Sequence, residues 1–131
     1  MIKVLIPDMP TADQLLPYLR RIDEARWYTN FGALNTELEG RLSAIYGSDV
    51  ITTSSCALGL ELALSSFGWP RGAFVLTPSL SFPGTAAAIK RCGLVPLYCD
   101  VDPDTWALTP AIAFGVWTHR PFHGILPVCA Y

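Results

Sequence analysis

From residue 50 onward the chain alternates between short apolar segments and helix-forming segments, and this order most restricts its fold. The apolar segments predict strands at Val50–Thr53, Phe74–Thr77, Leu94–Cys99 and Gly124–Cys129. Between them, helices are predicted at 56–67, 83–92 and 110–116. Strands that are apolar throughout are typical of parallel sheets with both faces covered. We therefore predict an α/β fold, three-layered as α/β/α, with a mostly parallel sheet.

The first 46 residues predict two further helices. Thr11 can cap a helix over 11–25, in which apolar side chains share one face at Leu15, Leu16, Leu19 and Ile22. Pro17 is expected to move the start of this helix to a later residue. The aromatic segment 26–34 is predicted to be extended. A second amphipathic helix is predicted over 35–46, beginning at Asn35 or Thr36 and ended by a glycine.

Composition narrows the class of protein further. The 131 residues fit about one domain. A net charge of −2 gives no electrostatic footprint for nucleic acid. The apolar stretches are interrupted before the roughly 20 residues of a membrane span, and the start lacks a signal-peptide pattern, so a cytoplasmic location is expected. Hydrophobic residues make up 51% and charged residues 15%, which indicates burial against a partner or a piece of a larger assembly.

Two turns are the best candidates for a site. The turn Thr52–Ala57 stands between a predicted strand and a helix N-terminus, where backbone N–H groups and the helix dipole favour an anion. Helix capping by serine explains the same residues without a ligand. The segment Pro78–Thr85 follows a strand at the carboxyl edge of the sheet, where ligands bind in open α/β folds. Its Phe82 could stack on a flat ring or pack in the core.

Other reactive residues favour structural roles. Three carboxylates in one loop, at Asp100, Asp102 and Asp104, lack the glycine and distal glutamate of an EF-hand and favour a solvated turn over a cation site. His119 and His123 have no acidic residue near them in sequence, so neither is expected to be catalytic. No pair of cysteines has metal-ligand spacing, and burial in a reduced state is expected for Cys56, Cys92, Cys99 and Cys129.

Taken in order, the segments resemble the nucleotide-sugar aminotransferases of the DegT/StrS type, within the fold-type I pyridoxal phosphate (PLP) enzymes. The resemblance extends over almost the whole chain and rests on the order and separation of six stretches: Trp27–Gly32, Leu38–Glu39, Ser54–Leu64, Pro78–Thr85, Gly93–Asp102 and Ile125–Val128. It implies the amino-terminal portion of the aminotransferase large domain, with an amino-terminal helix and arm at 1–34 and the α/β part at 35–131. It also implies that the small domain is absent.

The resemblance assigns roles to particular residues. Ser55, Cys56 and Ala57 would hold the cofactor phosphate, and Phe82 would stack on the pyridine ring. Substrate contacts would fall to two residues, Tyr28 and Asn30. The family has a threonine where this chain has Ala57, so one hydroxyl is missing. The family also has a histidine or similar polar residue where Cys129 stands.

The family reaction is PLP-dependent transfer of an amino group from an amino acid to a keto-sugar nucleotide, and it requires a Schiff-base lysine. The two lysines of this chain, Lys3 and Lys90, do not match the family's lysine motif. The chain alone is therefore expected to be inactive and not to bind PLP covalently, with no catalytic residue and no metal ligand. Its expected partners are a second copy or a complementary carboxy-terminal polypeptide. Alternatives are half of a split enzyme, a non-catalytic assembly module, and a phosphate- or nucleotide-binding α/β domain.

Overall fold

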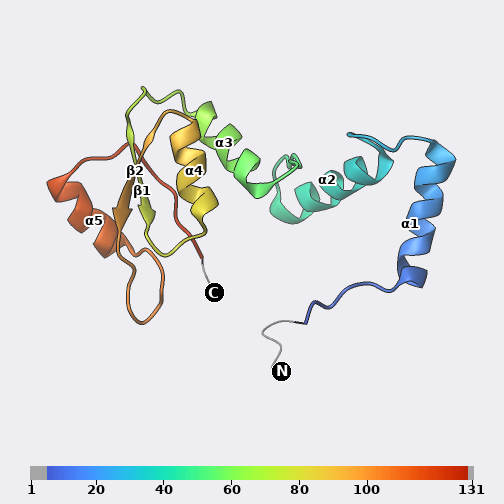
Figure 1. Ribbon diagram of the computed structural model, residues 1–131. Coiled ribbons are helices and arrows are strands. Elements are labelled where there is room, and N and C mark those ends of the chain that lie inside the picture. Colours follow the sequence, from blue (N-terminus) through green and yellow to red (C-terminus); the bar gives the residue numbers. More distant parts are fainter. Residues whose placement is uncertain (1–5, 130–131) are drawn as a thin grey trace. The chain divides into compact units, whose positions relative to one another are not determined.

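The computed structural model describes residues 6–129, which divide into two compact units between Thr52 and Thr53 (Figure 1). The first unit contains helix α1 (Ala12–Ala25) and helix α2 (Ala33–Tyr46). The second contains the sheet with its covering helices. Each unit has its own local structure and is described by itself.

Helix α1 begins where the sequence predicts, at a capping box. The Thr11 hydroxyl accepts a hydrogen bond from the backbone N–H of Gln14, whose side chain in turn accepts one from the backbone of Thr11. Pro17 lies inside the helix, so the expectation that it delays the start is wrong. The reason is that the box already satisfies donors of the first turn, while a proline in the second turn removes one backbone hydrogen bond.

The segment between α1 and α2 is a turn, and the prediction of an extended segment over 26–34 is wrong. Arg26 and Phe31 have positive φ angles of 50° and 62°, which are incompatible with a continuous extended backbone. Helix α2 begins at Ala33, earlier than predicted, after Gly32 as its N-cap.

The predicted strand at Val50–Thr53 does not form. The backbone N–H of Thr52 donates to the Glu39 carboxylate at 2.8 Å, and the Thr52 hydroxyl donates to the same oxygen at 2.7 Å. The hydroxyl also lies 2.8 Å from the side-chain oxygen of Asn35. These bonds, led by the one from the Thr52 N–H, lower the pKa of Glu39. The Thr52 N–H, which in a strand would donate to a neighbouring strand, thus donates to the Glu39 side chain of α2.

The second unit follows the predicted order of helices and strands. Its elements are α3 (Cys56–Ser66), β1 (Phe74–Pro78), α4 (Pro83–Arg91), β2 (Val95–Cys99), α5 (Pro110–His119) and β3 (Gly124–Ile125). The sheet is parallel with the order β2-β1-β3. Strand β3 is shorter than the predicted Gly124–Cys129 because it pairs with β1 only at Val75 and Leu76.

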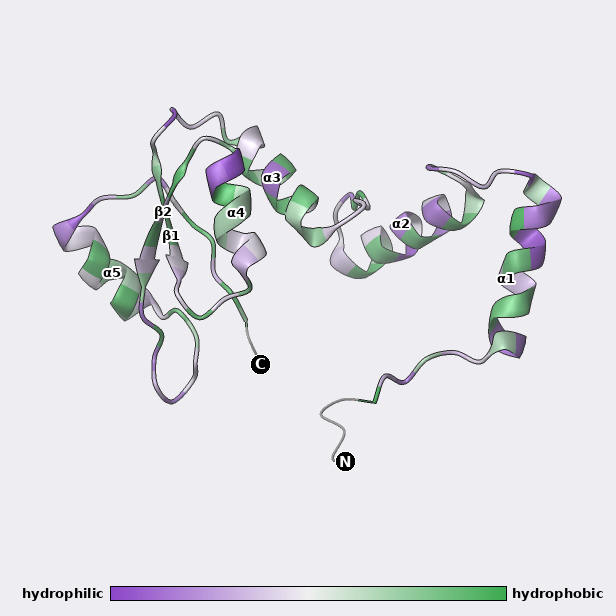
Figure 2. Ribbon diagram, in the orientation of Figure 1, coloured by the Kyte–Doolittle hydropathy of each residue, from purple (hydrophilic) through white to green (hydrophobic). Residues whose placement is uncertain are grey.

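Alternate side chains of β1 enter two cores on opposite faces of the sheet. Val75 packs with α3 and α4 in a cluster that also contains Leu64, Ala73, Ala88, Ile89 and Leu94. Leu76 packs with Cys99 and Ala113 below α5, a helix that Figure 2 shows as predominantly apolar. Helices therefore cover both faces, and the predicted α/β/α layering with a parallel sheet is confirmed.

Two expectations from composition can be checked in residues 6–129. Within that range no helix combines the length and the apolar character that crossing a membrane requires. All four cysteines are free, but only Cys99 is buried, while Cys92 is half-buried. The prediction of burial is wrong for Cys56 and Cys129, which are exposed. Cys56 is exposed because it occupies the first position of α3, at the end of that helix.

Candidate functional site

The serine-rich turn before α3 forms the N-terminus of that helix. Ser55 is the N-cap, and its Oγ accepts a hydrogen bond from the backbone N–H of Leu58 at 3.2 Å, as capping predicts. The N–H of Gly59 donates to the Ser55 carbonyl at 3.0 Å. Cys56 and Ala57 are the first two residues of α3, so their N–H groups have no acceptor within the helix and point out from its start. Two backbone donors and the positive end of the helix dipole thus converge here.

Close packing fixes the shape of this turn. The Thr53 hydroxyl donates to the Ser55 carbonyl at 3.0 Å. A Cβ added at Gly59 of α3 would lie 3.1 Å from the Thr53 hydroxyl oxygen, which is shorter than most Cβ contacts in proteins. The absence of a side chain at Gly59 therefore lets the incoming chain pass directly against the helix.

Phe82 stands at the second predicted site, immediately before α4. It is the N-cap residue of that helix, and its side chain is 80% exposed. The alternative that it belongs to the core is therefore excluded. It borders a hollow of about 220 Å³ whose walls are mostly hydroxyl-bearing, proline or aromatic residues: Thr77, Pro78, Ser79, Ser81, Phe82, Pro83, Thr85, Ala86 and Tyr98.

The second predicted turn lies at the carboxyl edge of the sheet, and the first begins a helix that packs against α4. Helices α3 and α4 pack side by side, and the carboxyl end of α4 contacts the middle of α3. Arg91 forms a 3.0 Å ion pair with Glu61, and the Cys92 thiol is 3.4 Å from the Glu61 carbonyl. Helix α4 begins just after the carboxyl end of β1, beyond the arrowhead of that strand in Figure 1. This is the edge at which open α/β sheets bind ligands.

The two turns carry the kinds of groups that bind a phosphorylated aromatic cofactor. The N–H groups at Cys56 and Ala57 can donate to phosphate oxygens, and the Ser55 hydroxyl can donate its proton because its oxygen already accepts from Leu58. The exposed ring of Phe82 offers a face for stacking on a flat ring. Donors for a charged phosphate and a face for an aromatic ring are thus both present in the second unit.

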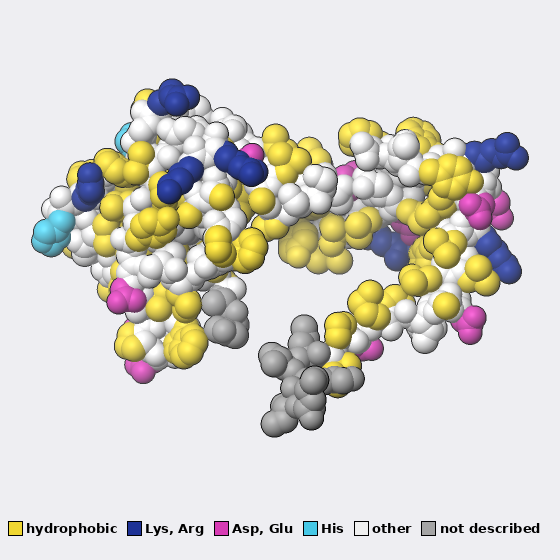
Figure 3. Space-filling view, viewed as in Figure 1, with side chains coloured by type: hydrophobic (Ala, Val, Ile, Leu, Met, Phe, Trp, Pro, Cys, Tyr) yellow, Lys and Arg dark blue, Asp and Glu magenta, His cyan; other side chains and the backbone are white. Residues whose placement is uncertain are grey.

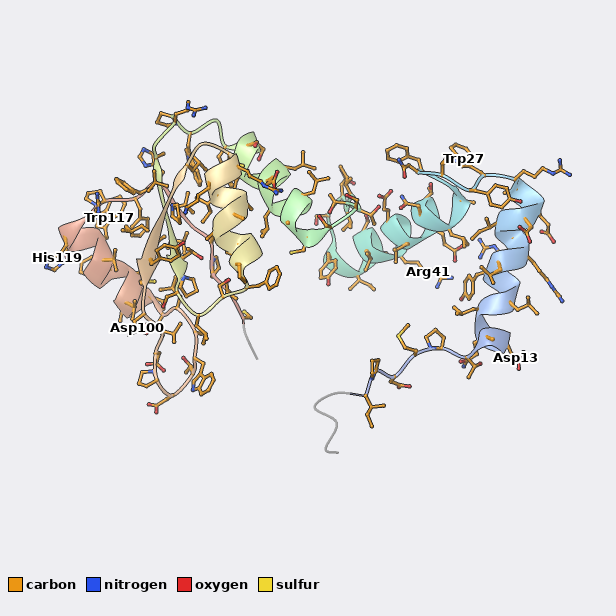
Figure 4. The ribbon with its side chains drawn as sticks, in the orientation of Figure 1. Asp13, Trp27, Arg41, Asp100, Trp117 and His119 are labelled. Atoms are coloured by element: carbon orange, nitrogen blue, oxygen red, sulfur yellow. The ribbon has the colours of Figure 1, made fainter. Side chains whose placement is uncertain are left out.

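The residues predicted to contact substrate lie in the first unit. Tyr28 is exposed, and its hydroxyl donates to the Asp23 carboxylate at 3.2 Å, which raises the pKa of Tyr28. The backbone carbonyl of Asn30 accepts a hydrogen bond from the indole N–H of Trp27 at 2.9 Å. Figure 4 shows Trp27 in this turn before α2. The turn is therefore held by side-chain bonds that need no ligand.

Two of the remaining candidates, Asp102 and His119, make local hydrogen bonds. Asp102 accepts hydrogen bonds from the N–H of Asp104 and from the N–H and hydroxyl of Thr105, which lower its pKa. His119 ends α5 with its Nδ1 3.0 Å from the Gly115 carbonyl (Figure 4). Within residues 6–129 no three His, Cys, Asp or Glu side chains cluster closely enough to hold a metal ion.

A larger hollow of about 530 Å³ lies beside α5, away from both predicted turns. Its lining is almost entirely apolar and includes Phe114, Trp117 and Ile125. Figure 3 likewise shows hydrophobic side chains reaching the surface of this unit. Its one hydroxyl, on Thr109, already caps α5 by accepting from the Ile112 N–H at 3.3 Å, and the first helical residue is a proline without an N–H, so size alone does not make this hollow the cofactor site.

Comparison with known proteins shows the family of this chain. Residues 11–131 match the model of the DegT/DnrJ/EryC1/StrS aminotransferase family. The chain belongs to this family. It is 34% identical over 99 residues to the UDP-2-acetamido-2-deoxy-3-oxo-D-glucuronate aminotransferase of Pseudomonas aeruginosa, covering 73% of this chain and 27% of that protein. It is 33% identical over 104 residues to the dTDP-4-amino-4,6-dideoxy-D-glucose transaminase of Escherichia coli, covering 79% and 28%.

The fold agrees as well. The crystal structure of NtdA from Bacillus subtilis, with its cofactor PMP bound, superimposes with a TM-score of 0.79 at 27% identity. That match covers 100% of this chain and 32% of NtdA. The family member described here thus spans about a third or less of the length of these relatives. The resemblance inferred from the sequence motifs is confirmed.

Two residues of the Phe82 hollow escaped the sequence analysis. Thr77 is 1% exposed, and its hydroxyl has no hydrogen-bond partner within residues 6–129. Tyr98 is paired with Thr77 across β1 and β2, so it stands at the same edge of the sheet. Their position in the sequence could have indicated them, because each is the next-to-last residue of its strand and therefore lies near the carboxyl edge of the sheet. Their types, a threonine and a tyrosine among apolar residues, gave no motif.

Proposed function

We propose that residues 53–131 hold the phosphate and one face of the pyridine ring of PLP, within an aminotransferase that acts on a nucleotide-linked keto sugar. The observation that carries this proposal is that one unit combines the open N-terminus of α3 with the exposed ring of Phe82. Ser55, Cys56 and Ala57 supply donors for the phosphate. The substrate class is supported by the UDP-sugar and dTDP-sugar relatives, and the cofactor by PMP in NtdA.

When bound, PLP withdraws electrons from the carbon that bears the amino group, which permits amino transfer. The residues of this chain contribute binding and orientation to that chemistry. The α3 N-terminus fixes the position of the phosphate, because backbone donors have a defined direction. Phe82 fixes the plane of the ring, because offset stacking favours parallel rings. Tyr28 and Asn30 are proposed to contact the sugar nucleotide.

The binding proposal can be tested with the 131-residue chain and PLP. We expect PLP to shift the amide NMR signals of Cys56 and Ala57, and inorganic phosphate to shift the same signals. Replacing Phe82 with leucine removes stacking worth about 0.5–1.5 kcal/mol and should weaken PLP binding roughly two- to tenfold. The response to inorganic phosphate should be unchanged.

The control is Phe114→Leu, because Phe114 is also exposed, at 70%, but lies on α5. This variant should bind PLP as the unchanged chain does. The proposal fails if PLP leaves the Cys56 and Ala57 amides unshifted, or if the two leucine variants lose equal affinity.

We also propose that a polypeptide of residues 1–131 does not catalyse amino transfer. Lys90 lies in the last turn of α4, about 10 Å along the helix axis from its start beside Phe82. Lys3 lies outside the described residues. With glutamate, a keto-sugar nucleotide and PLP, we expect no product above a control without protein.

Borohydride reduction followed by mass spectrometry checks the same point directly. We expect no one-to-one PLP adduct on Lys90 in the presence of the folded chain. An adduct that forms stoichiometrically and disappears in Lys90→Arg would contradict the proposal, as would product formation that depends on Lys90.

A further inference from the structure

The backbone around Phe82 is held by several local bonds. The N–H of Thr85 donates to the Phe82 carbonyl at 3.0 Å, which closes the first turn of α4. The Ser81 hydroxyl donates to the Thr85 hydroxyl at 2.7 Å, and Thr85 is only 8% exposed. Pro83 fixes its own φ at the first helical position. The position of the Phe82 ring therefore depends on the side-chain torsions of Phe82.

Gly84 leaves space for one position of that ring. A Cβ added at Gly84 would lie 2.9 Å from Cδ1 and 3.0 Å from Cε1 of Phe82. Separations of 3.0 Å or less are essentially never seen for real Cβ atoms, so any larger residue would move the ring. The ring thus rests with one edge against the backbone of the first helical turn.

The glycine is not required by the backbone. Its φ lies outside the left-handed range, and it is the second residue of a regular helix. Glycine lowers helix stability relative to alanine in such a position. The steric contact with Phe82 therefore accounts for a glycine that the local backbone conformation disfavours.

We propose that Gly84 is a positioning residue for the cofactor ring: its missing side chain lets one edge of the Phe82 ring rest against α4, which leaves a face of that ring exposed for stacking. This inference rests on the proposed role of Phe82. Alanine at 84 would displace the Phe82 ring from this position. Because that side chain is 80% exposed, the displacement meets little resistance and leaves the fold intact.

The test measures ring position and PLP affinity separately, on the 131-residue chain. In the unchanged chain, nuclear Overhauser contacts should join the Phe82 ring protons to the Gly84 Hα protons. Ring-current shifts of those Hα protons should disappear in Phe82→Leu. In Gly84→Ala, we expect displaced Phe82 ring signals, an unchanged unfolding midpoint or a slightly higher one, and PLP affinity weakened about two- to tenfold. Binding of inorganic phosphate should not change.

Gly115→Ala is the matched control, because a Cβ at that helical glycine would meet nothing within 4 Å. It should alter neither the Phe82 ring signals nor PLP affinity. Absence of the Phe82–Gly84 contacts in the unchanged chain would overturn the inference whether or not PLP binds. So would a Gly84→Ala variant in which the ring moves and PLP affinity stays the same. Failure of the unchanged chain to bind PLP would instead overturn the proposed function, and with it the role of Gly84 toward the cofactor.

Discussion

Replacing Ile89 with alanine is expected to destabilise the second unit by about 2–5 kcal/mol, the range for removing a large buried aliphatic side chain. Ile89 lies on α4 and is 0% exposed. It packs in the cluster that joins α3 and α4 to the face of β1 containing Val75. Loss of its side chain removes apolar contacts from two helices and a strand at once, and the closely packed surroundings can collapse only in part.

The measurement is urea unfolding of the unchanged and variant chains, followed by tryptophan fluorescence. The control is Leu62→Ala on α3, where the side chain is 56% exposed and truncation should cost far less. Equal losses for the two variants would show that this cluster does not stabilise the unit as its packing indicates.

The sequence predicts the elements of the second unit well because its apolar strands and capped helices carry local signals. Ser55 before α3 and the proline at the start of α5 mark helix starts through short-range hydrogen bonding and fixed torsions. Strand Phe74–Pro78 is recognised by its continuous apolar character. In these elements, residues within a few positions of one another decide the structure.

The failures occur where a distant residue decides the local structure. The predicted strand at Val50–Thr53 carries a β-branched pattern, but its Thr52 bonds to Glu39, which lies 13 positions earlier. Strand β3 ends at Ile125 because its pairing with β1 ends there, although apolar residues continue beyond it. Neither partner can be read from the strand's own residues.

The candidate site, like the fold, is predicted from the sequence only in part. Ser55 and Phe82 are found from sequence because each stands at a strand–helix junction, the place where α/β sheets bind ligands. The contribution of Gly84 depends on the torsions of the Phe82 side chain, and that of Gly59 on the path of Thr53. Sequence reasoning identifies where a ligand can bind, whereas the three-dimensional contacts identify what shapes the binding residues.

Gly124→Ala is expected to destabilise the second unit by about 1–3 kcal/mol, the cost of overpacking a well-filled region. A Cβ at this position would lie 2.1 Å from Cη2 of Trp69, with two more ring atoms within 3.0 Å. The strand cannot retreat easily, because the N–H groups of His123 and Leu126 both donate to β1 at 2.8 Å. Trp69 is itself stacked on Phe67, with 4.5 Å between ring centroids.

A double-mutant cycle separates this clash from a general effect of alanine. Trp69→Leu removes the indole atoms that the new Cβ would meet, so Gly124→Ala should cost less in that background, with a coupling of about 0.5–3 kcal/mol. Gly115→Ala, which adds the same methyl group to open space on α5, should be neutral or should stabilise the chain. If Gly124→Ala costs the same with and without Trp69, the indole does not restrict residue 124. In that case the glycine is required by the pairing of β3 with β1 rather than by the ring above it.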